Sequence, residues 1–283
     1  MTSHELSADE VLIAPVGVPV DAVQQLETGR VSLVGRMRNA SNGTFLVRID
    51  DPAGDPDDDG NGDGDGDGDG DGDGDGDGES PPRGLAIYKP LRGERPLWDF
   101  EPGLYRREVA AYVLSEVTGL GVVPPTVVRE DAPFGVGSLQ WFVNADFSHH
   151  YFSIAEEHPE LHDQLRDIAA FDVMANNTDR KGGHCLLEPA RAGRAGHVWA
   201  IDNGLCFAES FKLRTVIWEY AGEPLPANAL RAAQLVADGA PAALRTLLTA
   251  DEITAIERRA AQLVEIGVYP FDQSSHGYPW PLV

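Results

Sequence analysis

Residues 177–204 read NTDRKGGHCLLEPARAGRAGHVWAIDNG, and this stretch holds one aspartate near each end, Asp179 and Asp202. Asp179 lies in a polar loop after a long helical pattern, where an aspartate either forms a turn or accepts the proton of a hydroxyl nucleophile. Asp202 ends a short apolar run and precedes Asn203 and Gly204, so it is either a turn carboxylate or a ligand that holds Mg²⁺ against phosphates. Each motif taken alone leaves both interpretations open.

A lysine upstream of these motifs ends the apolar run Leu85-Ala-Ile-Tyr-Lys89. An ammonium group on a buried strand needs a counter-charge, because burying an isolated charge is costly. Glu108, inside the next helical pattern, or a phosphate can supply that charge; otherwise Lys89 lies in solvent at the end of its strand. Along the chain come a strand that ends in lysine, a helix that contains glutamate, a loop that contains aspartate, and a strand followed by Asp-x-Gly. Kinases have these elements in the same order. This order favours a nucleotide site over three unrelated turns.

Hydrophobic patterns divide the chain into a strand-rich part and a helical part. In the first part we expect strands at residues 31–37, 44–49, 85–89, 122–129 and 138–143, and one helix at 104–117. In the second we expect helices at 159–175, 226–237 and 241–248, a hairpin of 185–187 with 197–201, and capping boxes at 153–156 and 249–252. These patterns predict an α+β, bilobal fold, with a β-rich N-lobe over residues 1–143 and a helical C-lobe over residues 144–283. Together with the kinase order of the motifs, they predict a protein-kinase-like fold.

The charge balance limits which classes of partner the protein can bind. Acidic residues outnumber basic ones, 46 to 22, and the net charge is −24. This balance argues against a nucleic-acid partner and against stable association with an anionic membrane, because both need clusters of Lys or Arg. The chain has no run of about 18 apolar residues that would predict a membrane span. Its first residues lack the basic and apolar regions of a signal peptide, and two cysteines cannot form a disulfide framework. We therefore expect a cytoplasmic protein.

An acidic insert occupies residues 50–80, where fifteen Asp or Glu residues occur with no Lys or Arg. Most of the insert alternates Asp with Gly, so it has almost nothing apolar to bury and its charges repel one another. We expect a disordered loop within a hairpin rather than a domain boundary. Weak cation binding is the alternative, although the insert lacks the spacing and the final glutamate of an EF-hand loop.

Four histidines near the start of the helical part are a second candidate metal cluster: His149, His150, His158 and His162. His158 and His162 have the i,i+4 spacing of ligands on one helix face, but Pro159 between them makes a regular helix doubtful. No cysteine or clear third ligand joins them. The sequence therefore does not favour a metal site there.

Four stretches carry a family resemblance: LAIYKP at 85–90, the segment from Arg107-Glu108 to LGVVPPT at 120–126, NTDR at 177–180, and AIDNGLCF at 200–207. Together they resemble the phosphatidylinositol 3-/4-kinase-related superfamily, nearest to its type II phosphatidylinositol 4-kinase branch. They are also similar to an actinobacterial family of PI3/PI4-kinase-like proteins. The similarity covers roughly residues 31–265, without the acidic insert.

The resemblance implies that ATP is the nucleotide. Lys89 would bind its α- and β-phosphates, and Glu108 would hold Lys89 in place. The turn of Ser41, Asn42 and Gly43 would lie over the phosphates. The adenine would be bound by the segment of Gln140, Trp141, Phe142 and Val143.

The resemblance also implies roles for the 177–204 stretch. Asp179 would be the catalytic aspartate, Arg180 would support its loop, and Asp202 would ligate Mg²⁺. The family has Asn where this chain has His184. A neutral imidazole can ligate a metal, although Mg²⁺ prefers oxygen. This difference implies one of three outcomes: a Mg²⁺ site with a single carboxylate, a preference for Mn²⁺, or no turnover.

The acceptor is predicted less directly than the nucleotide. A lipid kinase must reach an anionic bilayer, which this acidic chain is poorly suited to do. We therefore expect an ATP-dependent phosphotransferase that acts on a hydroxyl of a soluble protein or small molecule. The alternatives are a nucleotide-binding pseudokinase with a regulatory role, a true phosphoinositide kinase, and an interaction protein that binds no nucleotide.

Overall fold

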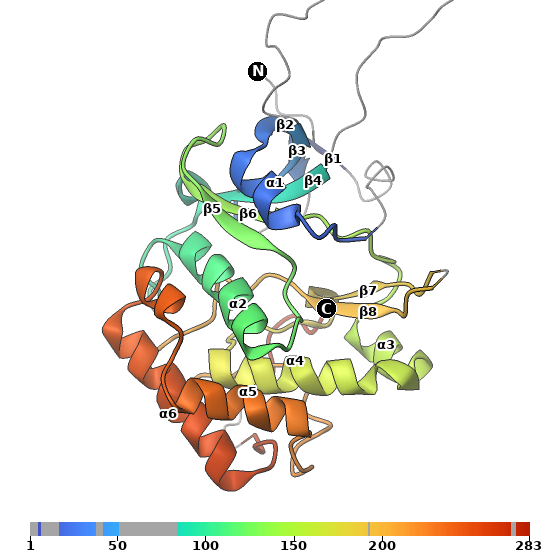
Figure 1. Ribbon diagram of the computed structural model, residues 1–283, viewed down its shortest axis with the longest axis vertical. Helices are drawn as coiled ribbons and strands as arrows, with labels where there is room; N and C mark the ends of the chain where they lie inside the picture. The colour runs from blue at the N-terminus through green and yellow to red at the C-terminus, as the bar shows by residue number, and fades with distance from the viewer. Residues whose placement is uncertain (1–4, 7–16, 38–41, 51–83, 192, 273–275) are drawn as a thin grey trace, which may run out of the picture.

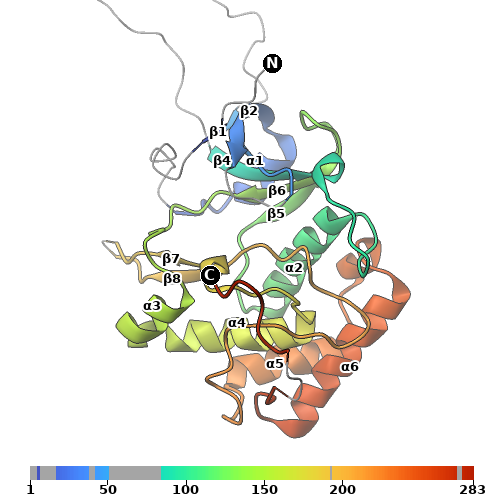
Figure 2. The same ribbon diagram turned by 180° about the vertical axis from the view of Figure 1, so that it is seen from behind.

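The computed structural model describes residues 5–6, 17–37, 42–50, 84–191, 193–272 and 276–283. A β-sheet lies at one end of the molecule and most of the helices lie at the other, as Figures 1 and 2 show from opposite sides. The predicted α+β fold with a β-rich N-lobe and a helical C-lobe is confirmed. It is a protein-kinase-like fold.

The N-lobe sheet has the strand order β1-β2-β3-β4-β6-β5, and every neighbouring pair is antiparallel except β1 with β2. Its strands are β1 (Glu5–Leu6), β2 (Arg30–Met37), β3 (Phe45–Asp50), β4 (Gly84–Pro90), β5 (Thr126–Arg129) and β6 (Gly137–Trp141). The strand expected at 122–129 is shorter than predicted, because Pro124 and Pro125 cannot donate to a ladder. Ile49 on β3 pairs with Gly84 on β4, so the acidic insert joins two adjacent strands. From residue 51 to its end, the insert lies outside the described residues.

The two faces of strand β4 lie in different environments. Ala86 and Tyr88 are buried beneath helix α1 (Ala22–Thr28), a short helix that the sequence patterns did not predict. Leu85 and Ile87 point to the opposite face, where they pack with Phe142. Because side chains alternate along a strand, Lys89 shares the face of Leu85 and Ile87.

Helix α2 (Leu104–Thr118) confirms the helix predicted at 104–117 and ends at Gly119, whose φ of 71° lies in the left-handed region. Its residues Ala110 and Leu114 belong to the core of the helical lobe. The Ser115 hydroxyl accepts the amides of Val122 and Val123, at 2.8 and 3.1 Å, and so fixes the loop that leads to β5. Helix α2 therefore packs on both lobes (Figure 1).

The C-lobe contains α3 (Tyr151–Glu157), α4 (His162–Ala175), α5 (Ala227–Ala237) and α6 (Ala250–Ile266), and the antiparallel hairpin of β7 (Cys185–Glu188) with β8 (His197–Ala200). Most of the second half of α4 is buried, so this helix is the centre of the lobe. The helix predicted at 159–175 begins with a separate 3₁₀ turn, Pro159–Leu161. The helix predicted at 226–237 and the hairpin are confirmed.

Two local predictions need correction and one is confirmed. Helix α3 is capped by His150, whose amide donates to the Ser153 hydroxyl at 3.0 Å, so the capping box predicted at 153–156 is wrong. The helix predicted at 241–248 is a 3₁₀ helix, Ala242–Thr246, because Pro241 and the next helix cap leave room for little more than one turn. The capping box at 249–252 is confirmed, since the Thr249 amide donates to Glu252 at 2.8 Å. Among the described residues, no helix has both the length and the apolar character that crossing a membrane requires.

Substituting Arg107 tests how firmly α2 is attached to the helical lobe. Arg107 pairs with Glu252 at the start of α6 and donates to the Cys206 carbonyl at 2.8 Å, and both charged side chains are nearly buried. We expect Arg107→Met to lower the free energy of unfolding by about 3 kcal/mol, because Glu252 loses its buried partner. Urea denaturation measures this loss. The matched control is Arg106→Met, which alters an exposed neighbour on the same helix; equal losses in both variants would contradict the account.

Candidate functional site

Lys89 meets two carboxylates that come from different parts of the fold. Its Nζ atom lies 2.5 Å from Oε1 of Glu108 on α2 and 2.8 Å from Oδ1 of Asp202, which follows β8. Glu108 is 3% exposed and the Lys89 side chain is 22% exposed, so Glu108 is buried and Lys89 is half-buried. The structure thus brings together three residues that are far apart in the sequence.

Glu108 also holds the loop that carries Asp202. Its second oxygen, Oε2, accepts the amide of Asn203 at 2.9 Å. A Cβ atom at Gly204 would lie only 3.2 Å from Glu108 Oε1, so the next residue of the loop must be small. One buried carboxylate therefore fixes the positions of both Lys89 and the Asp202 loop.

Asp202 has an unusual backbone and an accessible side chain. Its φ is 55°, in the left-handed region that costs a non-glycine residue roughly 1–2 kcal/mol. Its side chain is 51% exposed, although Asn203 beside it is fully buried. Such strain is often retained where a side chain must be presented in one direction. The arrangement suits a carboxylate that contacts a ligand.

The charges of Lys89 and Asp202 stabilise each other. Burial by itself would lower the pKa of Lys89, but attraction by Asp202 and Glu108 outweighs burial, and the pKa is raised. The charge of Lys89 is the main reason that the pKa of Asp202 falls below its usual range, against the opposing effect of burial. Both groups are therefore ionised at neutral pH, although solvent around Asp202 screens part of the attraction.

Arg180 links three segments from inside the core. Its side chain is completely buried, and Nε and Nη2 donate to Asp172 on α4 at 3.1 and 3.0 Å. Nη1 donates to the Ile201 carbonyl at 2.7 Å, and Nη2 donates to Asn203 Oδ1 at 2.6 Å. Helix α4, the 177–184 loop and the Asp202 loop are thus held by one guanidinium group.

Asp179 lies at the start of this loop with its backbone fixed. Its amide donates to Asn177 Oδ1 at 2.9 Å, which forms a tight turn. Its Oδ2 atom is 2.5 Å from Nζ of Lys181, and the side chain is 24% exposed. Asp179 is therefore a paired and partly accessible carboxylate.

His184 connects Asp179 to Asp202. Its Nδ1 lies 3.0 Å from the Asp179 carbonyl oxygen, and its Nε2 lies 3.4 Å from Asp202 Oδ2. Burial is the main cause that lowers the pKa of His184, so the ring is neutral at pH 7. A carbonyl oxygen can only accept, so this contact fits a ring proton on Nδ1 with a lone pair on Nε2. The Lys181 amide, which donates, also lies 3.4 Å from Nδ1 and fits the other tautomer, in which the Nε2 proton faces Asp202.

With the proton on Nδ1, His184 and Asp202 would fit a metal. In that tautomer Nε2 and Asp202 Oδ2 are both acceptors, and a cation between them makes their approach favourable. Metal-binding histidines commonly donate their other ring N–H to a carbonyl or a carboxylate, as His184 does in that tautomer. One nitrogen and one carboxylate suit Mn²⁺ better than Mg²⁺, which prefers oxygen ligands.

The residues expected to contact the adenine lie where β6 leads into the helical lobe. Gln140 is buried and donates to the Thr126 hydroxyl at 3.0 Å, and Trp141 packs in the N-lobe core. Phe142 packs against Leu46, and Val143 is buried beside Trp199. All four side chains are buried, so recognition of a base by this segment would use its backbone.

The turn expected over the phosphates lies beside the end of β4. The amide of Gly43 donates to the Gly93 carbonyl at 2.8 Å, and Asn42 Oδ1 accepts the Arg95 amide at 3.0 Å. Ser41 lies outside the described residues. The turn therefore touches the segment that directly follows Lys89.

Sequence reasoning missed Asp172, the buried partner of Arg180. The only signal was an aspartate within the apolar run Ile168 to Ala175, which must find a partner if that face is buried. It also missed the contact between the loop and the end of the chain. The Gly182 amide donates to the Leu282 carbonyl at 2.7 Å.

Two solved structures have an arrangement similar to this chain. The structure of hydra Fam20 with sugar matches with a TM-score of 0.48 and 14% identity, over 87% of each chain. The Helicobacter pylori proinflammatory kinase CtkA matches with a TM-score of 0.46 and 9% identity, over 86% of this chain and 94% of the other. Both scores are low, so the fold is assigned from its own lobes and connections.

Sequence comparison gives the stronger relationship. No family model matches the chain. Protein Rv2133c of Mycobacterium tuberculosis (strain ATCC 25618 / H37Rv) is 34% identical over 294 residues, which cover 90% of this chain and 93% of the relative. At this identity and coverage, the chain belongs to the same family as the mycobacterial Protein Rv2133c.

Proposed function

We propose that the chain is an ATP-dependent phosphotransferase of the PI3/PI4-kinase-like type, which uses a divalent metal and acts on a hydroxyl of a soluble acceptor. One observation carries the proposal: Lys89 contacts both Glu108 and Asp202. A triphosphate site needs a fixed cation for the phosphates and a nearby carboxylate for the metal. Here one half-buried lysine and one accessible carboxylate lie 2.8 Å apart.

The first step is binding of the triphosphate between Lys89 and Asp202. These groups contact each other directly, so the nucleotide must replace their ion pair. Glu108 would keep Lys89 oriented toward the phosphates throughout, because its other oxygen is fixed by the Asn203 amide. Asp202 would be released to hold the metal together with His184 Nε2. The metal, when bound, neutralises charge on the phosphoryl oxygens.

Asp179 would then act on the acceptor. In phosphoryl transfer the protein mainly positions the groups: the acceptor oxygen bonds to the γ-phosphorus while the bond to the leaving ADP breaks, and an aspartate orients the attacking hydroxyl and takes its proton. Asp179 is partly exposed and is linked to Asp202 through His184. Lys181 beside it could share the charge of the transferring group. Arg180 would maintain the loop geometry from beneath.

The acceptor class follows from charge. With 46 acidic and 22 basic residues, the chain repels an anionic bilayer more than it attracts one. A hydroxyl on a soluble protein or small molecule is therefore the proposed acceptor. His184 favours one second candidate, a nucleotide-binding regulator that performs no transfer, because its nitrogen is a poor Mg²⁺ ligand.

Nucleotide binding should depend on Lys89. At a nucleotide concentration about a hundredfold above Kd, we expect ATP with Mn²⁺ or Mg²⁺ to stabilise the protein by about 2.7 kcal/mol. Lys89→Met should remove most of this increment, because it removes the cation for the phosphates. Thermal melts with and without nucleotide measure it. Lys212→Met, which changes a lysine paired with Asp99, should keep the increment; a wild-type chain that gains nothing from ATP would refute the nucleotide site.

Transfer should depend on Asp179 while binding does not. We expect Asp179→Asn to retain the ATP-dependent stabilisation but to lower turnover by about 10²–10⁴-fold, because the proton acceptor is lost. Labelled ATP, followed as hydrolysis or autophosphorylation, provides the readout. Asp163→Asn, which changes a 93%-exposed carboxylate, serves as the control. Unchanged turnover in Asp179→Asn would leave the regulator as the better account.

Metal preference should depend on His184. We expect the wild-type chain to work better with Mn²⁺ than with Mg²⁺, and His184→Asn to move the preference toward Mg²⁺ by replacing a nitrogen ligand with oxygen. The ratio of activities in the two metals, or of the ATP-dependent stabilisation, measures the change. The same ratio in wild type and variant would show that His184 is not a ligand.

A further inference from the structure

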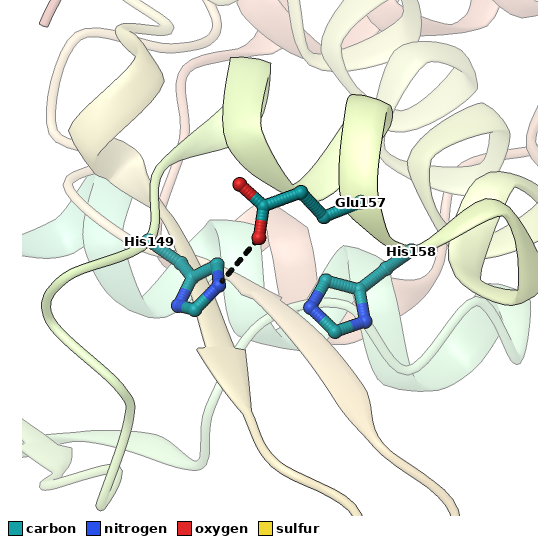
Figure 3. A group of neighbouring side chains, drawn as sticks. All are labelled: His149, Glu157 and His158. Carbon is teal, nitrogen blue, oxygen red and sulfur yellow. Dashed lines mark ion pairs between the residues drawn. The ribbon is translucent and has the colours of Figure 1, made fainter.

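A second cluster of metal-binding groups lies at helix α3, and it shares no residue with the Lys89 site. His149 precedes the helix, Glu157 is its last residue, and His158 follows it. One ligand atom of each lies within 4.8 Å of the others. Figure 3 shows the two imidazole rings facing each other, with the Glu157 carboxylate above the space between them.

Each ring is oriented by a carboxylate outside the cluster. His149 Nδ1 lies 3.2 Å from Asp146 Oδ2, and His158 Nδ1 lies 3.0 Å from Glu160 Oε1. In a neutral ring whose Nδ1 proton is donated to that carboxylate, the lone pair is on Nε2. His149 Nε2 lies 3.5 Å from Glu157 Oε2. Two ring nitrogens and one carboxylate therefore converge, and this set of groups can hold a cation.

We propose that His149, Glu157 and His158 bind a divalent transition metal, with Zn²⁺ the best match. Two imidazoles and one carboxylate are a ligand set that Zn²⁺ accepts, whereas Mg²⁺ and Ca²⁺ prefer oxygen alone. The carboxylate that holds the far nitrogen of each histidine is the usual partner of a metal-bound imidazole. Glu157 is 59% exposed, which leaves room for water as a fourth ligand.

The cluster differs from the one considered from the sequence. His150 caps helix α3, and His162 Nε2 contacts the Ala155 carbonyl at 2.8 Å, so neither joins the site. The third ligand is Glu157, which the spacing of histidines could not reveal. Only the fold brings His149 back to the end of the helix that it precedes.

A bound metal would stabilise the segment that connects the lobes. The segment from Val143 to His150 leads from β6 to α3, and the Asp146 amide already donates to Leu187 on β7 at 2.7 Å. His149 and its partner Asp146 belong to this segment, whereas Glu157 and His158 belong to the end of α3. Metal occupancy should therefore slow amide exchange across residues 144–150.

The test is a Zn²⁺ titration of the full chain after treatment with a chelator. Competition with a chromophoric chelator gives both stoichiometry and affinity. We expect the variant His149→Ala/His158→Ala to bind one equivalent fewer than wild type, and Glu157→Gln to bind that equivalent more weakly. His162→Ala should match wild type. Cation binding by the acidic insert or by Asp202 is common to all of these variants and cancels in the comparison.

Two further measurements separate a metal site from a general effect on folding. Asp146→Asn should weaken the same equivalent by about 10–100-fold without removing a ligand. At about a hundredfold over Kd, Zn²⁺ should raise Tm by about 5 °C or more in wild type and not in the double variant. Equal stoichiometry and affinity in wild type and the double variant would overturn the proposal, whatever the outcome for ATP.

Discussion

The pairing of the half-buried Lys89 ammonium group organises much of this molecule. Lys89 belongs to the sheet, Glu108 to a helix that packs on both lobes, and Asp202 to the helical lobe. Removing Lys89 would leave the buried Glu108 carboxylate without its counter-charge. The sheet, α2 and the Asp202 loop are therefore constrained to one relative arrangement, and that arrangement creates the candidate site.

A second ion pair, between Arg180 and Asp172, supports the pair of Lys89 and Glu108. Arg180 joins Asp172 on α4 to the Asp179 loop and to Asn203, and the Asn203 amide in turn donates to Glu108. A continuous set of hydrogen bonds thus runs from the centre of the helical lobe to Lys89. Such a network is rigid when all of its members are satisfied. Asp202 and Asp179, the accessible groups of the site, are attached to this network.

Much of this could be predicted from sequence, because strand and helix patterns and short motifs are local. The sequence singled out Lys89, Glu108, Asp179 and Asp202 by type, spacing and order. The structure places Lys89 against Glu108 and Asp202, and it links Asp179 to Asp202 only through His184. Asp172 and Glu157 were not identified, because each faces a residue eight positions away, Arg180 or His149, that meets it only once the intervening turn has folded. Helix α1 was missed for a similar reason: it is a short helix whose two buried side chains matter only once the sheet is in place.

The central claim is that Lys89, Asp202 and His184 surround one metal–nucleotide complex. Pulsed electron paramagnetic resonance of Mn²⁺ with ATP tests it most directly, using the His149→Ala chain to remove the second proposed site. The account predicts that the bound Mn²⁺ couples both to phosphorus of ATP and to an imidazole nitrogen, and that His184→Asn loses only the nitrogen coupling. A spectrum in which bound Mn²⁺ shows no phosphorus coupling would contradict the account.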